Sequence, residues 1–186
     1  LLRHILVVLV GGLGFRQRFA DPARDRRMGG DTVAVSLQCR REQGADFCWY
    51  CEARVDILCK HPDLLQTMRQ AGLARVQIGI ESGDQKILDA YGKGVTVDQI
   101  RRAVGMAVEA GVPSIVGNFI IGGAHETADS LARSLDFAQE LIELAPGRID
   151  LTTTYLTPYP GTAIRLQPRK YGVRIDDAEC LTGQDD

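Results

Sequence analysis

The chain has 186 residues, of which 45% are hydrophobic and 25% charged, and its formal net charge is −2 at pH 7. This size and composition are ordinary for one globular domain with a substantial core. A charge so close to zero gives no support to nucleic acid or to an anionic membrane as a partner.

Residues 1–46 contain one readable element, the apolar run from Ile5 to Gly14. The run has the length of a signal-peptide apolar region, but no Ala-x-Ala site follows it, and it is too short to span a bilayer. Because buried parallel strands read as continuous apolar runs, we favour a buried strand. Phe15 to Asp31 is rich in Arg, Asp and Gly without periodicity, which predicts a loop or an insert.

Residues 47–162 alternate regularly between β-rich and helical stretches. The predicted strands are Cys48–Val55, Arg75–Ile80, Ser114–Ile121 and Ile149–Leu156. The predicted helices are Asp63–Gln70, Asp84–Tyr91, Val97–Ala110 and Thr127–Leu144. This order predicts βα units with a parallel sheet, in an α/β fold that is either doubly wound or a barrel. Residues 163–186 are polar and irregular, and we expect a loose end there.

Glu81 directly follows a predicted strand, between Gly79 and Gly83. Residues at the carboxyl ends of parallel strands are often functional, and the glycines permit close approach of backbone and ligand. A carboxylate there suits a ligand ammonium group or a ribose. The alternative is a surface Glu that caps the next helix at Asp84.

Arg54 ends the preceding predicted strand, so it lies on the same rim as Glu81 if the two strands are neighbours. Its guanidinium suits a ligand carboxylate. The alternative is a structural ion pair with Glu81 or with Asp56, which contributes little to stability if it is exposed.

Two further strand ends carry turn-forming residues. Gly122 and Gly123 leave room for a ligand edge, but alone they are a weak signal, since the alternative is a simple turn before a helix. Pro158-Tyr-Pro-Gly-Thr162 predicts a rigid turn in which Tyr159 offers an aromatic face and Gly161 permits the reversal.

Five cysteines is an odd number, which argues against a secreted disulfide framework and indicates a reducing, cytoplasmic compartment. Cys48 and Cys51 form a Cys-x2-Cys pair that could serve as a redox dithiol or half of a zinc site. Positions three apart in a strand point to opposite faces, so we favour small buried side chains over a metal or redox site.

Five motifs occur in an order that resembles the radical S-adenosylmethionine (SAM) enzymes, over about residues 44–162. They are Trp49-x-Cys-x2-Arg54, Gly79-Ile-Glu-Ser-Gly83, Lys93-Gly-Val-Thr96, Phe119-Ile-Ile-Gly-x3-Glu-Thr127 and Pro158-Tyr-Pro-Gly-Thr162. The resemblance implies a partial (β/α)6 TIM-like barrel with parallel strands, truncated at its N-terminal side. It divides the chain into an N-terminal segment (1–46), the βα repeats (47–162) and a polar tail (163–186).

The resemblance also implies SAM and a [4Fe–4S] cluster as cofactors. Glu81 and Ser82 would contact the ribose or the amino acid part of SAM, and Arg54 would face its carboxylate or stabilise Glu81. Adenine would lie beside the two glycines after the strand 114–121, and the loop 158–162 would close over it. The implied cofactor-binding residues are Arg54, Gly79, Glu81, Ser82, Gly122, Gly123, Pro158, Tyr159 and Gly161.

The cluster-binding Cys-x3-Cys-x2-Cys of the family is absent from this sequence. We therefore expect a fragment of a radical SAM enzyme that binds no cluster and is inactive alone. The full-length protein would act on a small molecule with an electron donor such as flavodoxin or ferredoxin, by methyl transfer or oxidative cyclisation. The branch it most resembles often carries a cobalamin domain, and use of cobalamin is left open. One alternative is a non-catalytic barrel-derived binding or scaffold module; the other is an unrelated α/β barrel enzyme that uses Glu81 and Arg54.

Overall fold

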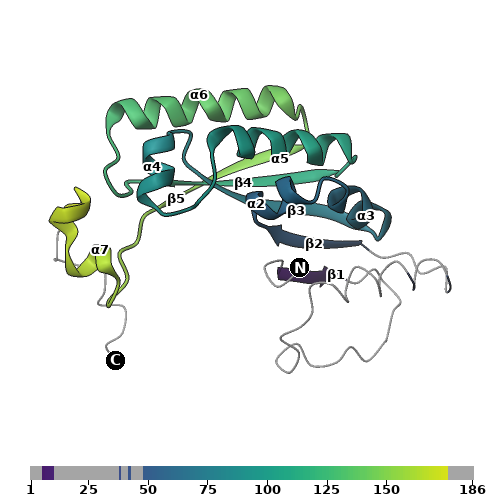
Figure 1. Ribbon diagram of the computed structural model, residues 1–186, viewed down its shortest axis with the longest axis horizontal. Helices are drawn as coiled ribbons and strands as arrows, with labels where there is room; N and C mark the ends of the chain where they lie inside the picture. The colour runs from purple at the N-terminus through teal and green to yellow at the C-terminus, as the bar shows by residue number, and fades with distance from the viewer. Residues whose placement is uncertain (1–5, 11–37, 39–41, 43–47, 176–186) are drawn as a thin grey trace.

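The computed structural model describes residues 6–10, 38, 42 and 48–175 of the chain. Within these residues, five strands form one sheet in the order β1-β2-β3-β4-β5 (Figure 1). The strands are β1 (Leu6–Val10), β2 (Cys48–Ala53), β3 (Leu73–Glu81), β4 (Ser114–Ile121) and β5 (Ile149–Tyr155). Each of β2 to β5 runs parallel to its neighbours in this group, which confirms the predicted parallel α/β fold.

Helices cover one face of this sheet, and α4, α5 and α6 are seen together on that side in Figure 1. Buried residues of α2, α3, α5 and α6 belong to the same apolar core as alternate residues of the strands. The helices are α2 (Val55–Lys60), α3 (Leu64–Gln70), α4 (Gln85–Ala90), α5 (Val97–Glu109), α6 (Ala128–Leu144), α7 (Ala163–Leu166) and the 3-10 turn η1 (Pro168–Tyr171).

Alternation along the strands separates an apolar face from a polar one. On β3, Val76, Ile78 and Ile80 are fully buried, whereas Gln77 and Gly79 between them are half-buried. Because successive side chains of a strand point to opposite faces, the residues between the core positions form the face that the helices leave uncovered. This polar face carries the candidate site.

Two helices begin at capping boxes that the sequence encodes. The Thr96 hydroxyl accepts a hydrogen bond from the Gln99 amide (3.1 Å), and the Gln99 side chain accepts one from the Thr96 amide (2.8 Å). These reciprocal bonds satisfy amides that the first turn of a helix leaves unpaired. The predicted cap of α5 at Thr96 is thus confirmed, and Thr127 caps α6 in the same way.

The expected strand 48–55 is too long, since β2 ends at Ala53 and α2 begins at Val55. The aromatic residues Trp49 and Tyr50 and the β-branched Val55 favour a strand when the segment is read alone. In the fold, Val55 and Leu58 lie one helical turn apart and are both buried in the core. Tertiary packing therefore selects the helix.

β1 confirms that a strand lies within Ile5–Gly14, but the expectation that it is parallel is wrong. It pairs antiparallel with β2, from Leu6 opposite Glu52 to Val10 opposite Cys48. An apolar run fits either direction, and an antiparallel strand at the edge of a mostly parallel sheet is common.

The polar segment after Thr162 is not wholly irregular, because it contains α7 and η1. The expected loop 15–31 and the last residues, 176–186, lie outside the described part of the chain. No helix among the described residues has the length and apolar character needed to cross a membrane.

Candidate functional site

Glu81 ends β3 in an unusual backbone conformation, with φ at 66°. Residues with a Cβ rarely adopt this left-handed conformation, which is concentrated at turns and functional sites. The pairing of β3 with β4 shifts register between Gly79 and Glu81. Such an irregularity re-aims side chains out of the regular alternation of a strand.

Lys93 forms an ion pair with Glu81, through a hydrogen bond from Nζ to Oε1. Lys93 lies on the loop between α4 and α5, where Gly92 and Gly94 both have positive φ (63° and 66°). Glycine adopts this conformation without steric strain, so the two residues bend the loop back over the end of β3. The side chains are 34% and 15% exposed for Lys93 and Glu81.

Gly79 leaves the space that this ion pair occupies. A Cβ at residue 79 would lie 2.5 Å from Glu81 Oε1 and 2.9 Å from Lys93 Nζ. The predicted close approach at Gly79 is therefore made by two side chains of the protein itself.

A pocket of about 280 Å³ lies around the ion pair, on the polar face of the sheet. Two carboxylates and two cations occur together in it, and ligand pockets characteristically combine a few convergent polar groups with a shaped cavity. The lining residues are Glu52, Ala53, Arg54, Gln77, Gly79, Glu81, Lys93 and Asn118. Three predicted site residues, Arg54, Gly79 and Glu81, are thus brought together.

The other lining residues were not predicted from the sequence. Lys93 opens the motif Lys93-Gly-Val-Thr96, but the motif alone predicts no role for its side chain. Gln77 and Asn118 sit between buried residues of β3 and β4, and their polarity was a usable signal. Register pairs Glu52 with Gln77 and Gly79 with Asn118 across adjacent strands, and this pairing could not be obtained without the fold.

Arg54 lines the pocket but pairs with Asp56, with 2.9 Å between Nε and Oδ1. The expected alternative of an Arg54–Asp56 ion pair is confirmed, and an Arg54–Glu81 pair is wrong, since Glu81 is held by Lys93. The hydrogen bond from Arg54 keeps the pKa of Asp56 below its ordinary value. Arg54 is 53% exposed, so its remaining donors face solvent and the pocket.

Ser82 is buried, and its hydroxyl lies 3.0 Å from that of Ser134 on α6 and accepts a hydrogen bond from the Asp84 amide. The Gly83 amide donates to the same Ser134 hydroxyl at 2.9 Å. These bonds fasten the turn after β3 to α6. The Ser82 side chain therefore has partners within the protein and does not line the pocket.

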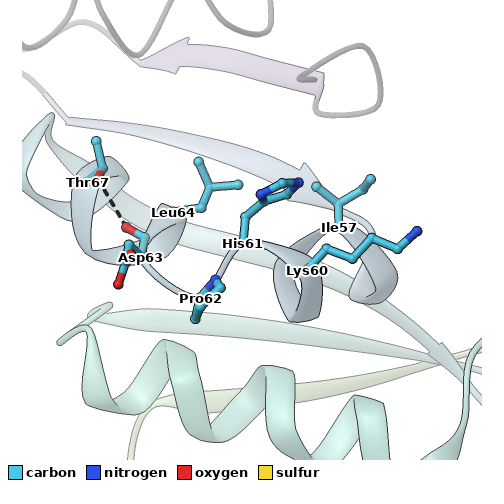
Figure 2. Close-up of a pocket in the computed structure, with 7 residues that line it drawn as sticks. All are labelled: Ile57, Lys60, His61, Pro62, Asp63, Leu64 and Thr67. Carbon is cyan, nitrogen blue, oxygen red and sulfur yellow. Dashed lines mark hydrogen bonds between the residues drawn. The ribbon is translucent and has the colours of Figure 1, made fainter.

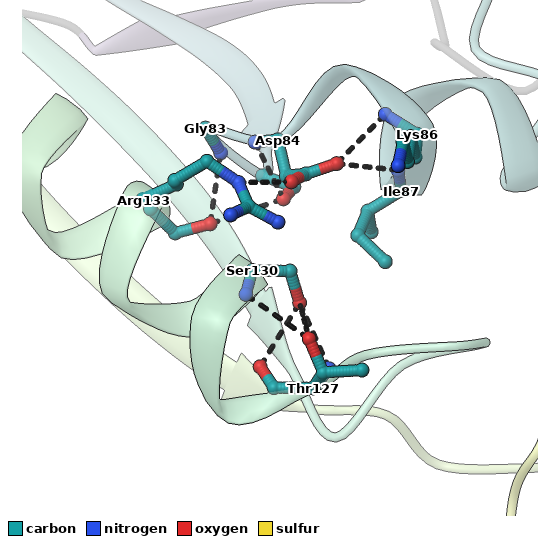
Figure 3. A network of polar contacts seen from close by, with 9 residues as sticks. Gly83, Asp84, Lys86, Ile87, Thr127, Ser130 and Arg133 are labelled. Carbon is teal, nitrogen blue, oxygen red and sulfur yellow. Dashed lines mark hydrogen bonds and ion pairs between the residues drawn. The ribbon is translucent and has the colours of Figure 1, made fainter.

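Asp84 caps α4, because its Oδ1 accepts hydrogen bonds from the amides of Lys86 (2.8 Å) and Ile87 (3.3 Å). The alternative that Glu81 caps this helix is therefore wrong. Figure 3 shows the other Asp84 oxygen pairing with Arg133 of α6. Burial raises the pKa of Asp84, but the Arg133 guanidinium and the two amides outweigh burial and leave the pKa below its ordinary value.

Gly122 and Gly123 occupy different surroundings. Gly122 is exposed, has φ at 74°, and donates its amide to Glu126 at 2.5 Å. Gly123 is buried, and a Cβ there would lie 1.5 Å from the Tyr91 hydroxyl. Its lack of a side chain therefore makes room for Tyr91, and the predicted contact with adenine remains a prediction.

The Tyr91 hydroxyl is buried and has no hydrogen-bond partner among the described residues. Burial raises the pKa of Tyr91 to about 12, with smaller contributions from Glu126 and Glu81. Buried hydroxyls almost always have a hydrogen-bond partner. Because the Tyr91 hydroxyl has none among the described residues, we infer that packing around the ring, and not a hydrogen bond, holds this side chain in place.

The turn Pro158–Thr162 follows β5 and does not line the pocket. Gly161 has φ at 83°, and the Thr162 hydroxyl donates to the Tyr159 carbonyl at 2.7 Å. Tyr159 is 65% exposed and is not among the residues that line the pocket, so the predicted closure of its loop over a ligand remains a prediction.

A second pocket, of about 450 Å³, lies in the helical layer between α2 and α3 (Figure 2). Its lining residues are Ile57, Lys60, His61, Pro62, Asp63, Leu64 and Thr67. All of them come from the two helices and the turn that joins them. None follows the end of a parallel strand, where ligands of such folds bind.

A match to a family model excludes one alternative that the sequence left open, an unrelated α/β barrel enzyme. The model of the radical SAM superfamily matches residues 28–138, which is more than half of the chain. The chain belongs to the radical SAM superfamily. The parallel α/β architecture and the strand-end pocket are consistent with this membership.

Among curated relatives, the chain is 34% identical over 133 residues to an uncharacterized methyltransferase of Pyrococcus horikoshii, covering 71% of this chain and 27% of that protein. It is 32% identical over 92 residues to the anaerobic magnesium-protoporphyrin IX monomethyl ester cyclase of Rubrivivax gelatinosus, covering 50% of this chain and 16% of that protein. The chain therefore spans only 27% and 16% of the length of these two relatives.

Solved structures support the fold. The radical SAM methyltransferase TsrM from Kitasatospora setae, with cobalamin and a [4Fe–4S] cluster bound, matches with a TM-score of 0.61 and 15% identity, over 79% of this chain and 29% of that chain. The cobalamin-dependent radical SAM enzyme OxsB matches with a TM-score of 0.59 and 19% identity, over 86% of this chain and 28% of that chain. The fold is thus that of the barrel-like radical SAM core.

Radical SAM enzymes use SAM and a [4Fe–4S] cluster, and the residues here fit the two cofactors unequally. Cys51 is fully buried and Cys48 is exposed, so the two thiols point to opposite faces as predicted. The expectation that both are buried is wrong for Cys48, because its position in β2 lies on the face opposite to the core. Burial raises the pKa of Cys51 to about 12, which disfavours the thiolate that an iron site requires. No group of three His, Cys, Asp or Glu side chains in the described residues could hold a metal ion. The described residues therefore do not fit the cluster, whereas the charged pocket fits the polar groups of SAM.

Proposed function

We propose that this chain is the part of a radical SAM core that binds the nucleoside and amino acid portions of SAM in the pocket around Glu81. The observation that carries the proposal is the placement of Glu81. Its carboxylate is presented at the carboxyl end of β3 from a left-handed backbone position. Functional groups of parallel α/β folds are typically built at this edge.

The free atoms of the pocket suit SAM. Glu81 uses Oε1 to bind Lys93, and among the described residues Oε2 accepts no hydrogen bond, so it is available to a ribose hydroxyl or an ammonium group. Arg54 uses Nε to bind Asp56, which leaves its terminal nitrogens for a carboxylate. A volume of about 280 Å³ accommodates part of SAM, with the rest at the open side of the pocket.

The full-length protein would reductively cleave SAM to methionine and a 5′-deoxyadenosyl radical, a reaction that requires one electron from outside these residues. The names of the relatives support methyl transfer or cyclisation as its outcome. We further propose a small-molecule substrate, a flavodoxin or ferredoxin as electron donor, a cytoplasmic location, and cobalamin as a further cofactor, as in TsrM and OxsB.

A second candidate function is a non-catalytic barrel-derived binding module. It is favoured by the lack of a metal-holding group in the described residues and of Cys-x3-Cys-x2-Cys in the sequence. Both candidates retain a SAM-type pocket, and they differ in the chemistry that other protein segments supply.

Calorimetric titration of the 186-residue chain with SAM tests the proposal. Glu81→Gln should weaken SAM binding about tenfold, since a hydrogen bond to a charged group contributes about 1.5–3 kcal/mol. Glu109→Gln makes the same chemical change at an exposed position of α5 and should leave binding unchanged. No detectable SAM binding, or equal loss in both variants, would overturn the proposal.

Anaerobic reconstitution with iron and sulfide separates the two candidate functions. A stoichiometric [4Fe–4S] absorption spectrum from this chain alone would contradict the conclusion that its residues do not fit the cluster. If SAM binds and no cluster forms, supplying the cluster-bearing segment in trans should restore SAM cleavage in the enzyme fragment but not in the binding module.

A further inference from the structure

The loop that carries Lys93 is held by two residues of α4, Leu88 and Gln85. At its start, the Lys93 amide donates to the Leu88 carbonyl at 3.2 Å, which ties the loop to the end of α4. The Gln85 side chain then bridges the loop, because Nε2 donates to the Val95 carbonyl (3.2 Å) and Oε1 accepts from the Val97 amide (3.1 Å). These hydrogen bonds hold the backbone on either side of Lys93. Less conformational entropy is therefore lost when the Lys93 side chain is fixed.

Three unfavourable or restrictive features converge on one ion pair. Glu81 adopts a positive φ, Gly79 lacks the side chain that would displace the pair, and Lys93 is presented between two left-handed glycines. A partly exposed ion pair contributes little to stability, so stability alone does not account for this construction. Strained, over-determined positions of this kind are characteristic of sites that hold a group ready for a ligand.

We infer that Lys93 is a positioning residue, which fixes one oxygen of Glu81 so that the other is presented to the ribose hydroxyls of the bound nucleoside. The inference rests on the proposed function of the pocket. The Lys93 ammonium is a compact charge with three donors, and it holds Oε1 from the side of the α4–α5 loop. Oε2 then has a defined direction, and Lys93 acts on the ligand through Glu81.

The distinguishing measurement compares adenosine with 2′,3′-dideoxyadenosine, which lacks the hydroxyls that Glu81 would bind. The wild-type chain should bind adenosine about tenfold more tightly, as expected for one charge-assisted hydrogen bond. Lys93→Met should reduce this preference about fivefold or more, while the affinity for 2′,3′-dideoxyadenosine should change little. Lys93→Arg, which keeps the charge, should recover part of the preference. Lys86→Met, at an exposed position of α4, is the matched control.

If Lys93 had only a structural role, its substitution would weaken the binding of both nucleosides equally. An unchanged preference for adenosine in Lys93→Met would therefore overturn the inference. Glu81→Gln should remove the preference, and adding Lys93→Met to it should cause no further loss, because the two residues act as one unit. Additive losses would contradict the inference, since they would mean that Lys93 contacts the ligand directly.

Two checks separate this inference from the function on which it rests. If the wild-type chain binds neither SAM nor adenosine, the proposed function fails and takes the inference with it. If SAM binds and the ribose preference is insensitive to Lys93, only the inference fails. Thermal unfolding of each variant shows that it is folded, and Lys93→Gln, which is also uncharged, replaces Lys93→Met if that variant is not.

Discussion

Arg133 of α6 forms an ion pair with Asp84, the residue that caps α4 (Figure 3). Asp84 is 5% exposed and Arg133 is 53% exposed. One carboxylate thus supports the start of a short helix and fastens it to the next βα unit. Because Glu81 lies three residues before Asp84, this attachment also fixes the end of β3 at which the pocket is built.

Substitution of Asp84 should separate its capping role from its charge. Asn caps helices about as well as Asp, so Asp84→Asn removes only the charge and should lower the free energy of unfolding by about 1 kcal/mol. Asp84→Ala also removes the cap and should lower it by about 1 kcal/mol more. Urea unfolding of the two variants measures the difference, and equal stabilities would show that the side chain does not cap α4.

The same carboxylate should make stability depend on pH in the acid range. The folded pKa of Asp84 is below its ordinary value, which is about 3.9 in an unfolded chain. Its charge therefore stabilises the fold above about pH 4, and this contribution is lost as pH falls through the folded pKa. The stability difference between wild type and Asp84→Asn should narrow from pH 6 to pH 3. A constant difference across this range would contradict the ion pair.

Two glycines of the sheet, Gly117 and Gly79, should respond differently to alanine. At Gly117, a Cβ would lie 2.4 Å from Ile80 Cδ1 and 2.8 Å from Leu151 Cδ2, so Gly117→Ala should destabilise the core by about 1–3 kcal/mol. At Gly79, the neighbours are the ends of two polar side chains beside an open pocket. Gly79→Ala should therefore unfold at nearly the wild-type temperature but bind SAM at least about fivefold more weakly. Unfolding and titration of both variants test the contrast.

The unpaired Tyr91 hydroxyl gives a fourth prediction. Tyr91→Phe removes a buried group without a described partner and should leave stability unchanged or raise it by up to about 1 kcal/mol. Gly123→Ala should be strongly destabilising, since its Cβ would meet that hydroxyl at 1.5 Å. The double variant should regain part of the loss. A loss of about 1 kcal/mol or more in Tyr91→Phe alone would show instead that the hydroxyl has a partner.

Thiol reactivity tests the orientation of the Cys-x2-Cys pair. Cys51 is buried with a pKa of about 12, so only about one thiol in ten thousand would be ionised at pH 8. Iodoacetamide should modify exposed Cys48 in the native protein and Cys51 only after unfolding. Peptide mass spectrometry identifies the modified residues. Equal native labelling of both thiols would contradict their placement on opposite faces.

Much of the fold was accessible from the sequence because local signals and tertiary packing agree. The strand at Ser114–Ile121 and the cap at Thr96 follow from apolar runs and capping chemistry alone. The direction of β1 was not accessible, because an apolar run does not encode its pairing partner. The helix from Val55 was missed because its β-branched residues favour a strand until the core is formed.

The candidate site was only partly predictable from the sequence, because some of its residues come together only through the packing of distant segments. Glu81, Gly79 and Arg54 stand at strand ends, where position alone suggests a role. Lys93 reaches the pocket only because two left-handed glycines return its loop to the end of β3, and sequence position gave no sign of that contact. The burial of Ser82 against Ser134 depends on the packing of α6, which lies far along the chain.

The space at residue 79 also limits how this site can change during evolution. A side chain there and the Glu81–Lys93 pair exclude each other, because all three would occupy the same volume. Relatives that replace Gly79 should therefore have also lost the acidic or the basic partner. Those that keep both charges should keep the glycine. Residues 79, 81 and 93 are expected to be inherited as a set.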